Sequence, residues 1–186
     1  YGIKLEASLP QIWDLANFFA TEKMLDATAK QVIDPLNGLK AVCYYGCMAS
    51  RPPEITEAKD VENPQALDRI VANLGATPID WPFKTDCCGA SQALSRLDIV
   101  TQLVGKLFDM AQRVGAQAIA VSCQMCQANL DMYQEKIQAD WGKPFSMPVY
   151  YFTELIGLAS ELKGVNKWLS RHITDPFPLL RELGLG

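Results

Sequence analysis

Residues 117–126 are Gln-Ala-Ile-Ala-Val-Ser-Cys-Gln-Met-Cys, an apolar run that ends on the first cysteine of a CxxC pair. A short, continuous apolar run of this kind is typical of a strand buried on both faces of a parallel sheet. The order recurs at residues 39–47, Leu-Lys-Ala-Val-Cys-Tyr-Tyr-Gly-Cys, where Cys47 follows a second such run. Both stretches predict central strands whose carboxyl ends carry cysteines.

Outward from these strands, the chain alternates between helical and extended patterns. Apolar residues near a 3.6-residue period, together with capping and stop signals, predict helices at 9–29, 63–75, 91–114, 126–142 and 153–162. Further strands are expected at 77–81 and 147–152. This alternation predicts an α/β domain, Rossmann-like, with a mainly parallel sheet, helices on both faces and the cysteine loops at the carboxyl edge.

Five of the six cysteines form one ordered set: Cys47, the adjacent pair Cys87 and Cys88, and the CxxC pair Cys123 and Cys126. Thiolates are the ligands of soft metal centres, and a CxxC spacing lets two of them converge within one turn of backbone. Neighbouring side chains diverge, so two contiguous cysteines suit two metals of one cluster better than one tetrahedral zinc ion. The pattern favours iron and sulfide.

Three other interpretations of the cysteines remain open. Structural disulfides are typical of short chains with little core, whereas this chain has 186 residues. A structural zinc site takes four thiolates and leaves the fifth unexplained. Burial as a small apolar side chain fits Cys43, which lies inside the predicted strand at 39–45.

Charge and hydropathy exclude other classes of function. The net charge is −4, the pI is about 5.0 and basic residues are scattered, so we expect no nucleic-acid partner. No apolar run is long enough to span a membrane, and the chain is expected to be cytoplasmic. The start at Tyr1 suggests that a segment is missing upstream. We expect a helical segment over 1–36, which packs on the sheet or on a missing upstream half, and a cysteine-rich domain over 37–186.

Three motifs carry a resemblance to a known family: Tyr44-Tyr-Gly-Cys-Met-Ala-Ser-Arg-Pro-Pro-Glu54, Asp86-Cys-Cys-Gly-Ala90 and Ser122-Cys-Gln-Met-Cys-Gln-Ala-Asn-Leu130. In this order they resemble the C-terminal cysteine-rich CCG domain found in the B subunit of heterodisulfide reductase, and the tail from His172 to Leu180 is similar to the ending of that protein. The resemblance implies that Cys47, Cys87, Cys88, Cys123 and Cys126 bind a noncubane [4Fe-4S] cluster, in which two small iron-sulfur units share atoms.

The same resemblance implies an oxidoreductase that reduces a disulfide to two thiols, as in methanogenesis. The family's protein carries two CCG motifs, whereas this chain has one, so it would form half of the active site, with a second CCG domain as its partner. Electrons would come from other subunits that carry iron-sulfur clusters and flavin, and the substrate would be a small-molecule disulfide.

Other residues are weaker candidates. Arg51 and Lys84 flank the cysteine loops and are candidates for attracting an anionic disulfide, although solvated surface charges are an equal interpretation. His172, the only histidine, is a candidate proton donor to a product thiolate, with a surface or capping role as the alternative. A second function also fits: an electron-transfer or structural CCG subunit of a quinone-linked oxidoreductase, with zinc as a substitute metal.

Overall fold

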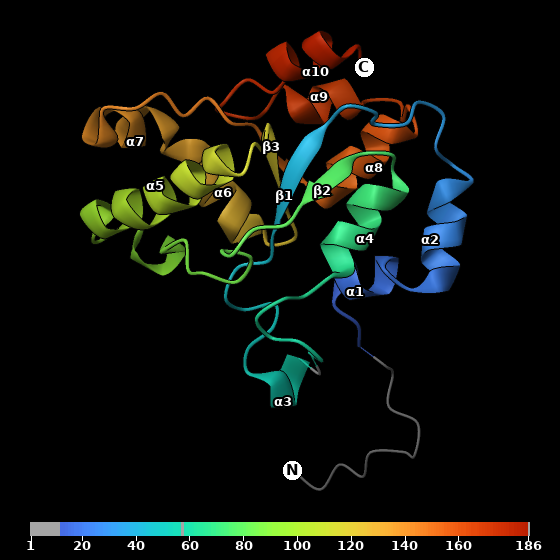
Figure 1. The fold of residues 1–186 in the computed structure, drawn as a ribbon, viewed down its shortest axis with the longest axis horizontal. Coiled ribbons are helices and arrows are strands. Elements are labelled where there is room, and N and C mark those ends of the chain that lie inside the picture. Colours follow the sequence, from blue (N-terminus) through green and yellow to red (C-terminus); the bar gives the residue numbers. More distant parts are fainter. Residues whose placement is uncertain (1–11, 57, 186) are drawn as a thin grey trace, which may run out of the picture.

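A four-stranded parallel sheet runs through the centre of the protein in the order β2-β1-β3-β4 (Figure 1). The computed structural model describes residues 12–56 and 58–185. The strands are β1 (Lys40–Tyr44), β2 (Thr77–Ile79), β3 (Ala118–Val121) and β4 (Val149–Tyr151). All three pairings are parallel, which confirms the predicted class of sheet.

Ten helices and one 3-10 turn connect the strands in the described part of the chain. They are α1 (Leu15–Phe19), α2 (Glu22–Ala29), α3 (Pro53–Thr56), α4 (Ala66–Asn73), the 3-10 turn Ala90–Gln92, α5 (Leu97–Arg113), α6 (Gln124–Met132), α7 (Gln134–Trp141), α8 (Phe152–Ala159), α9 (Val165–Leu169) and α10 (Phe177–Leu183). In Figure 1, α5, α6 and α7 gather on one side of the sheet, whereas α1, α2, α4 and α8 lie on the other. No helix among these has the length and apolar character needed to cross a bilayer.

The central strand β1 divides the core into two layers. Successive side chains of a strand point to opposite faces, so Ala41 and Cys43 enter one apolar cluster while Val42 and Tyr44 enter the other. We call these the aliphatic face, covered by α1, α2, α4 and α8, and the thiol face, covered by α5, α6 and α7. Cys43 is completely buried, as predicted for a core residue.

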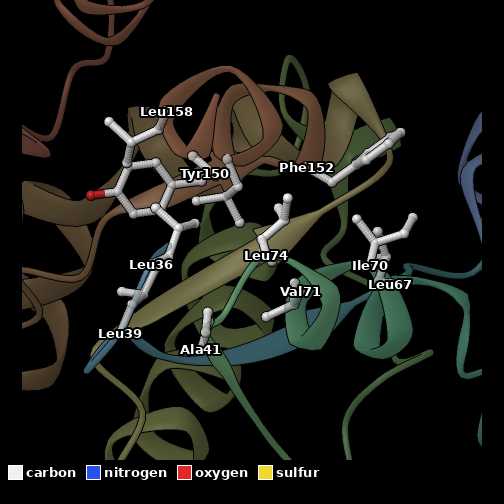
Figure 2. Packing of buried hydrophobic residues seen from close by; sticks show 14 of the residues in the cluster. Leu36, Leu39, Ala41, Leu67, Ile70, Val71, Leu74, Tyr150, Phe152 and Leu158 are labelled. Carbon is white, nitrogen blue, oxygen red and sulfur yellow. The ribbon is translucent and has the colours of Figure 1, made fainter. Parts of the chain in front are cut away.

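Close packing of α4 against the sheet defines the aliphatic face (Figure 2). Leu67, Ile70, Val71 and Leu74 project from α4 into a cluster that also holds Tyr150, and all five are buried. Burying each such aliphatic side chain contributes on the order of 1.5–3 kcal/mol. The layer therefore anchors β1 and β3 and fixes where their carboxyl ends lie.

The thiol face combines aliphatic side chains with aromatic rings and buried cysteines. Phe108 on α5 stacks on Phe145 with ring centroids 5.7 Å apart. Trp141 on α7 lies so close to Gly105 that a Cβ there would sit 2.3 Å from the indole, so α5 and α7 approach each other at this glycine. The same cluster includes Cys88 and Cys126. The core therefore runs without interruption into the cysteine loops.

Two predicted helices are interrupted. The helix expected at 9–29 is two helices, because Thr21 has an extended backbone (φ −67°, ψ 148°) between α1 and α2; residues 9–11 lie outside the described residues. The helix expected at 126–142 begins at Gln124 and breaks at Tyr133, whose φ of −108° and ψ of 12° separate α6 from α7.

Two other helices start later than predicted. The helix expected from Asn63 begins at Ala66, because the N–H of Asn63 donates to the side chain of Asp60 in a turn and Gln65 becomes the N-cap. The helix expected from Ser91 begins at Leu97. The 3-10 turn Ala90–Gln92 and the residues after it intervene, so α5 does not directly follow the cysteine pair.

Candidate metal centre

The five cysteines of the ordered set all follow strands at the carboxyl edge of the sheet, four in loops and Cys126 in the first turn of α6. Cys47 follows β1, Cys87 and Cys88 follow β2, and Cys123 follows β3 as the N-cap of α6. Parallel strands place their carboxyl ends at the same edge, where open α/β sheets bind ligands. The fold therefore brings together three cysteine groups that are far apart in the sequence.

Three of the thiols form a connected group. The sulfurs of Cys88 and Cys126 are 3.8 Å apart, and Cys126 is also hydrogen-bonded to Cys123. The hydrogen bond to Cys126 lowers the pKa of Cys88 to about 6, and the corresponding bond lowers the pKa of Cys123 to about 6. The pKa of Cys126 is raised because its thiol bonds to both neighbours. The thiol of Cys126 therefore favours the thiolate form of both Cys88 and Cys123.

Cys47 and Cys87 form the outer part of the set. Burial, followed by the charge of Cys87 and a hydrogen bond to it, raises the pKa of Cys47. The thiol of Cys87 is exposed, and the N–H of Gly89 donates to its sulfur over 3.3 Å. Gly89 has a φ of +76°, in the left-handed region that favours glycine, so its backbone can turn toward the sulfur. One end of the thiol set is therefore open to solvent.

A glycine lies against the buried end of the set. Gly46 has a φ of +69°, and a Cβ at this position would be 2.7 Å from the sulfur of Cys126. Only a residue without a side chain fits between β1 and Cys126. The glycine of the Gly46-Cys47 pair is therefore required by the site as well as by the turn.

Two neutral polar side chains surround Cys88. The Tyr44 hydroxyl donates to the carbonyl of Asp86 over 2.6 Å, and burial raises the pKa of Tyr44. The amide of Asn129 donates to the carbonyl of Cys88 over 2.8 Å, and its Oδ1 is buried without a partner. Both side chains also lie beside the Cys88 thiol and lower its pKa. Sequence reasoning missed these residues, although Asn129 lies one helical turn after Cys126.

The donor set matches the chemistry of a thiophilic cluster. It offers five sulfur atoms, two of them on side chains whose pKa lies near 6, a glycine that permits close approach, and a buried amide oxygen without a partner. Within 12–56 and 58–185, no group of three His, Cys, Asp or Glu side chains is already arranged to hold a metal ion. The ligand set stays a prediction.

Exposed apolar side chains border the thiols on all three loops. Met48 follows Cys47, Leu94 follows the Cys87–Cys88 loop, and Met125 lies inside the CxxC pair. Ile55 extends this group along α3, and all four side chains are largely exposed. We call these four residues the apolar rim. Exposed apolar side chains on or after the cysteine loops offer surface that another molecule can cover.

Arg51 and Lys84 occupy different environments. Arg51 is half exposed and forms an ion pair with Glu62 over 2.6 Å, beside the Cys47 loop. Lys84 is only 2% exposed, and its ammonium lies 3.0 Å from the carboxylate of Asp68 and 3.5 Å from that of Asp80. Lys84 is therefore not a solvated surface charge, and its role in attracting an anionic substrate stays a prediction.

His172 lies between α9 and α10, and its side chain belongs to a hydrogen-bond network. Its side chain is 4% exposed, its Nε2 is 3.0 Å from Glu154 and its Nδ1 has no partner. Glu154 also accepts a hydrogen bond from Gln127 on α6. Together with Trp168, these residues line a surface cavity of about 520 Å³. The side chain of His172 is therefore largely buried although it lines this cavity, and its substrate role stays a prediction.

Comparison with known proteins places the cysteine region in a family. Residues 41–131 match the model of the cysteine-rich domain CCG. Among curated proteins, the chain is 27% identical over 78% of its length to the 8-methylmenaquinol:fumarate reductase membrane anchor subunit of Wolinella succinogenes, covering 51% of that protein. It is 28% identical over 76% of its length to the B subunit of the Ferredoxin:CoB-CoM heterodisulfide reductase of Methanosarcina mazei, covering 46%.

A third relative, from Archaeoglobus profundus, is a protein named for its likeness to the B subunit of heterodisulfide reductase; it is 27% identical over 66% of the chain and 42% of its own length. The chain therefore spans about half the length of the curated relatives that it matches. The first two are subunits of reductases. The predicted resemblance is confirmed: residues 41–131, which carry all five cysteines of the ordered set, match the model of the cysteine-rich domain CCG.

Proposed function

We propose that Cys47, Cys87, Cys88, Cys123 and Cys126 together bind a noncubane [4Fe-4S] cluster. The observation that carries the proposal is the convergence of three cysteine groups on one sheet edge, where the sulfurs of the buried Cys88 and Cys126 lie 3.8 Å apart. Such a cluster, when bound, supplies single electrons and iron sites that accept thiolate sulfur.

The surrounding residues would prepare the thiols for this role. Gly46 gives Cys126 space on its strand side, while the polar side chains of Tyr44 and Asn129 beside Cys88 favour its thiolate form. The exposed Cys87 would mark the side from which a substrate approaches. Arg51, beside the Cys47 loop, remains a candidate for steering an anionic substrate to that side.

We propose further that the chain is a catalytic module of a heterodisulfide reductase-type complex. The reaction is the cleavage of a disulfide by two electrons and two protons, which gives two thiols. Electrons would arrive from partner subunits that carry iron-sulfur clusters and flavin. The apolar rim supports a second CCG domain as the partner that covers the open side and supplies the other half of the site. Residues 37–186 would be the cluster-binding unit, with 1–36 flanking it, in a cytoplasmic complex.

A second function is an electron-transfer or structural CCG subunit of a quinone-linked oxidoreductase, with zinc as a substitute metal. The alignment with the 8-methylmenaquinol:fumarate reductase membrane anchor subunit, which covers 78% of the chain, favours this alternative. Binding of a thiol product to the metal centre separates the two functions, because only a disulfide reductase has to hold a product sulfur there.

The test measures iron, acid-labile sulfide and zinc in the chain purified without oxygen, and then its EPR spectrum after oxidation with and without a small thiol. We expect about four irons and a signal that changes with the thiol. Iron and sulfide with no effect of the thiol would support the quinone-linked alternative. Zinc without sulfide would contradict the iron-sulfur proposal.

A further inference from the structure

A buried ion pair lies directly behind two of the cysteine loops. Lys84 precedes Cys87 in the chain, and its ammonium is 3.0 Å from Oδ1 of the buried Asp68 on α4. Withdrawing two charges from water costs several kcal/mol per ion, and apolar replacements of such pairs are often neutral or stabilising. Stability alone therefore does not explain why a lysine occupies this position.

The other oxygen of the same carboxylate reaches the Cys47 loop. The hydroxyl of Tyr45 donates to Oδ2 of Asp68 over 2.7 Å and accepts the N–H of Leu67, at the start of α4, over 2.7 Å. Tyr45 is separated from Cys47 only by Gly46. Asp68 therefore joins the segment before Cys47 to the segment before Cys87.

Backbone hydrogen bonds also connect the segment before Cys47 to the segment before Cys87. The carbonyl of Lys84 accepts the N–H of Tyr45 over 2.8 Å and the N–H of Gly46 over 3.3 Å. These bonds lie beyond the strand ladder, because the last paired residues of β1 and β2 are Val42 and Ile79. The two loops are thus joined twice where the sheet no longer holds them.

We propose that Lys84, Asp68 and Tyr45 form a positioning device that sets the distance between the thiol of Cys47 and the Cys87–Cys88 pair. The inference rests on the proposed function only in taking these cysteines as one ligand set. This positioning role requires no contact between the three side chains and a substrate or cluster. Their role is to fix two loops relative to each other, at a cost in desolvation that an apolar core would avoid.

The direct test is the equilibrium constant for forming the Cys47–Cys87 disulfide in the metal-free chain at fixed glutathione ratios, followed by mass spectrometry. Tyr45 lies two residues before Cys47 and Lys84 three residues before Cys87, so the effective concentration of one thiol at the other reports the spacing of the loops. We expect Tyr45→Phe, and the double variant Lys84→Met with Asp68→Asn, each to lower this constant about tenfold, the equivalent of one lost buried hydrogen bond.

Two matched controls separate positioning from general damage. Tyr150→Phe removes another buried hydroxyl, which donates to Pro176, and Arg69→Met with Glu22→Gln removes an exposed ion pair of α4. Both should leave the constant within about twofold of the wild type. The same constant in the Tyr45→Phe chain as in the wild type, or an equal fall in the Tyr150→Phe chain, would overturn the proposal.

A second measurement covers the case in which a variant folds poorly. The free energy of unfolding of each metal-free chain is measured in parallel, and only a fall in the disulfide constant without matching destabilisation of the fold supports positioning. Because the assay contains no metal, absence of iron from the wild type would reject the proposed function and leave this inference standing. The proposed function and the positioning role can therefore be rejected independently of each other.

Discussion

The aliphatic face and the thiol face of the sheet share the same strands but have different contents. Cys43 and Tyr44 are neighbours on β1, yet Cys43 is enclosed by the aliphatic cluster, whereas Tyr44 lies beside Cys88. The aliphatic face packs against helices, whereas the thiol face continues to the exposed Cys87. Burial alone does not separate Cys43 from Cys88 and Cys126, which are also buried; the face of the sheet on which each side chain lies does.

Removing one thiol from each face should give the largest difference in iron and sulfide binding between the two faces. Cys88→Ser should abolish iron and sulfide binding, because Cys88 belongs to the connected thiol group. Cys43→Ala should retain both and lose on the order of 1–2 kcal/mol of stability from the small cavity. Metal and sulfide analysis of chains purified without oxygen checks the result. Equal loss of iron in both variants would make the distinction between the faces wrong.

Truncation of one leucine in each layer gives the next largest effect. Leu74→Ala on the aliphatic face and Leu130→Ala on the thiol face should each cost about 2–5 kcal/mol, measured by denaturant unfolding. Only Leu130→Ala should also accelerate iron release to a chelator, since Leu130 lies one helical turn from Cys126 on α6. Similar release rates in the two variants would show that the layers respond as one unit.

A pair of glycine variants tests the closeness of the thiol face to β1. Gly46→Ala and Gly115→Ala both force a side chain into the left-handed region, at about 1–2 kcal/mol each. At Gly46 the new Cβ would also meet the Cys126 sulfur, whereas at Gly115 nothing lies within 4 Å. Gly46→Ala should therefore bind less iron than Gly115→Ala at matched stability. Identical iron content would mean that the contact has no effect on the site.

The smallest expected effect concerns the segment that joins the two faces. His172 bonds to Glu154 on α8, while the N–H groups of Ile173 and Thr174 donate to Asp131 on α6. Burial lowers the pKa of His172, but the hydrogen bond and charge of Glu154 and the charge of Asp131 outweigh it, so the pKa is raised above 6.5.

Protonation of His172 therefore stabilises the fold. This contribution is complete below the ordinary pKa of 6.5 and is lost as the pH rises through the folded-state pKa. In His172→Gln the stability advantage at acidic pH should disappear. Unfolding free energies of the wild type and His172→Gln across this pH range check the prediction, and parallel pH profiles would contradict it.

The sequence predicted the strands and cysteine loops because each depends on local signals. The apolar runs at β1 and β3 are too short for buried helices and end on cysteines, which placed the site at the correct sheet edge. The role of Cys43 followed from its position inside such a run, and the structure confirms its burial.

The failures arise where tertiary contacts override local pattern. Lys84 resembled a surface cation because nothing nearby in the sequence identifies Asp68 as its buried partner. Tyr44 and Asn129 were missed because their relation to Cys88 appears only when three loops meet. Helix starts were misplaced where side chains such as Asp60 hold the preceding residues in turns.

The 3.8 Å gap between the Cys88 and Cys126 sulfurs also bears on preparation of the protein. A thiolate adjacent to a thiol is poised for aerobic oxidation, and a modest side-chain rotation would bring the sulfurs to the roughly 2.05 Å of a covalent bond. A chain isolated in air would then be two hydrogens lighter, fully folded and unable to take up iron. Reduction has to precede any attempt at reconstitution, and intact mass is the appropriate check.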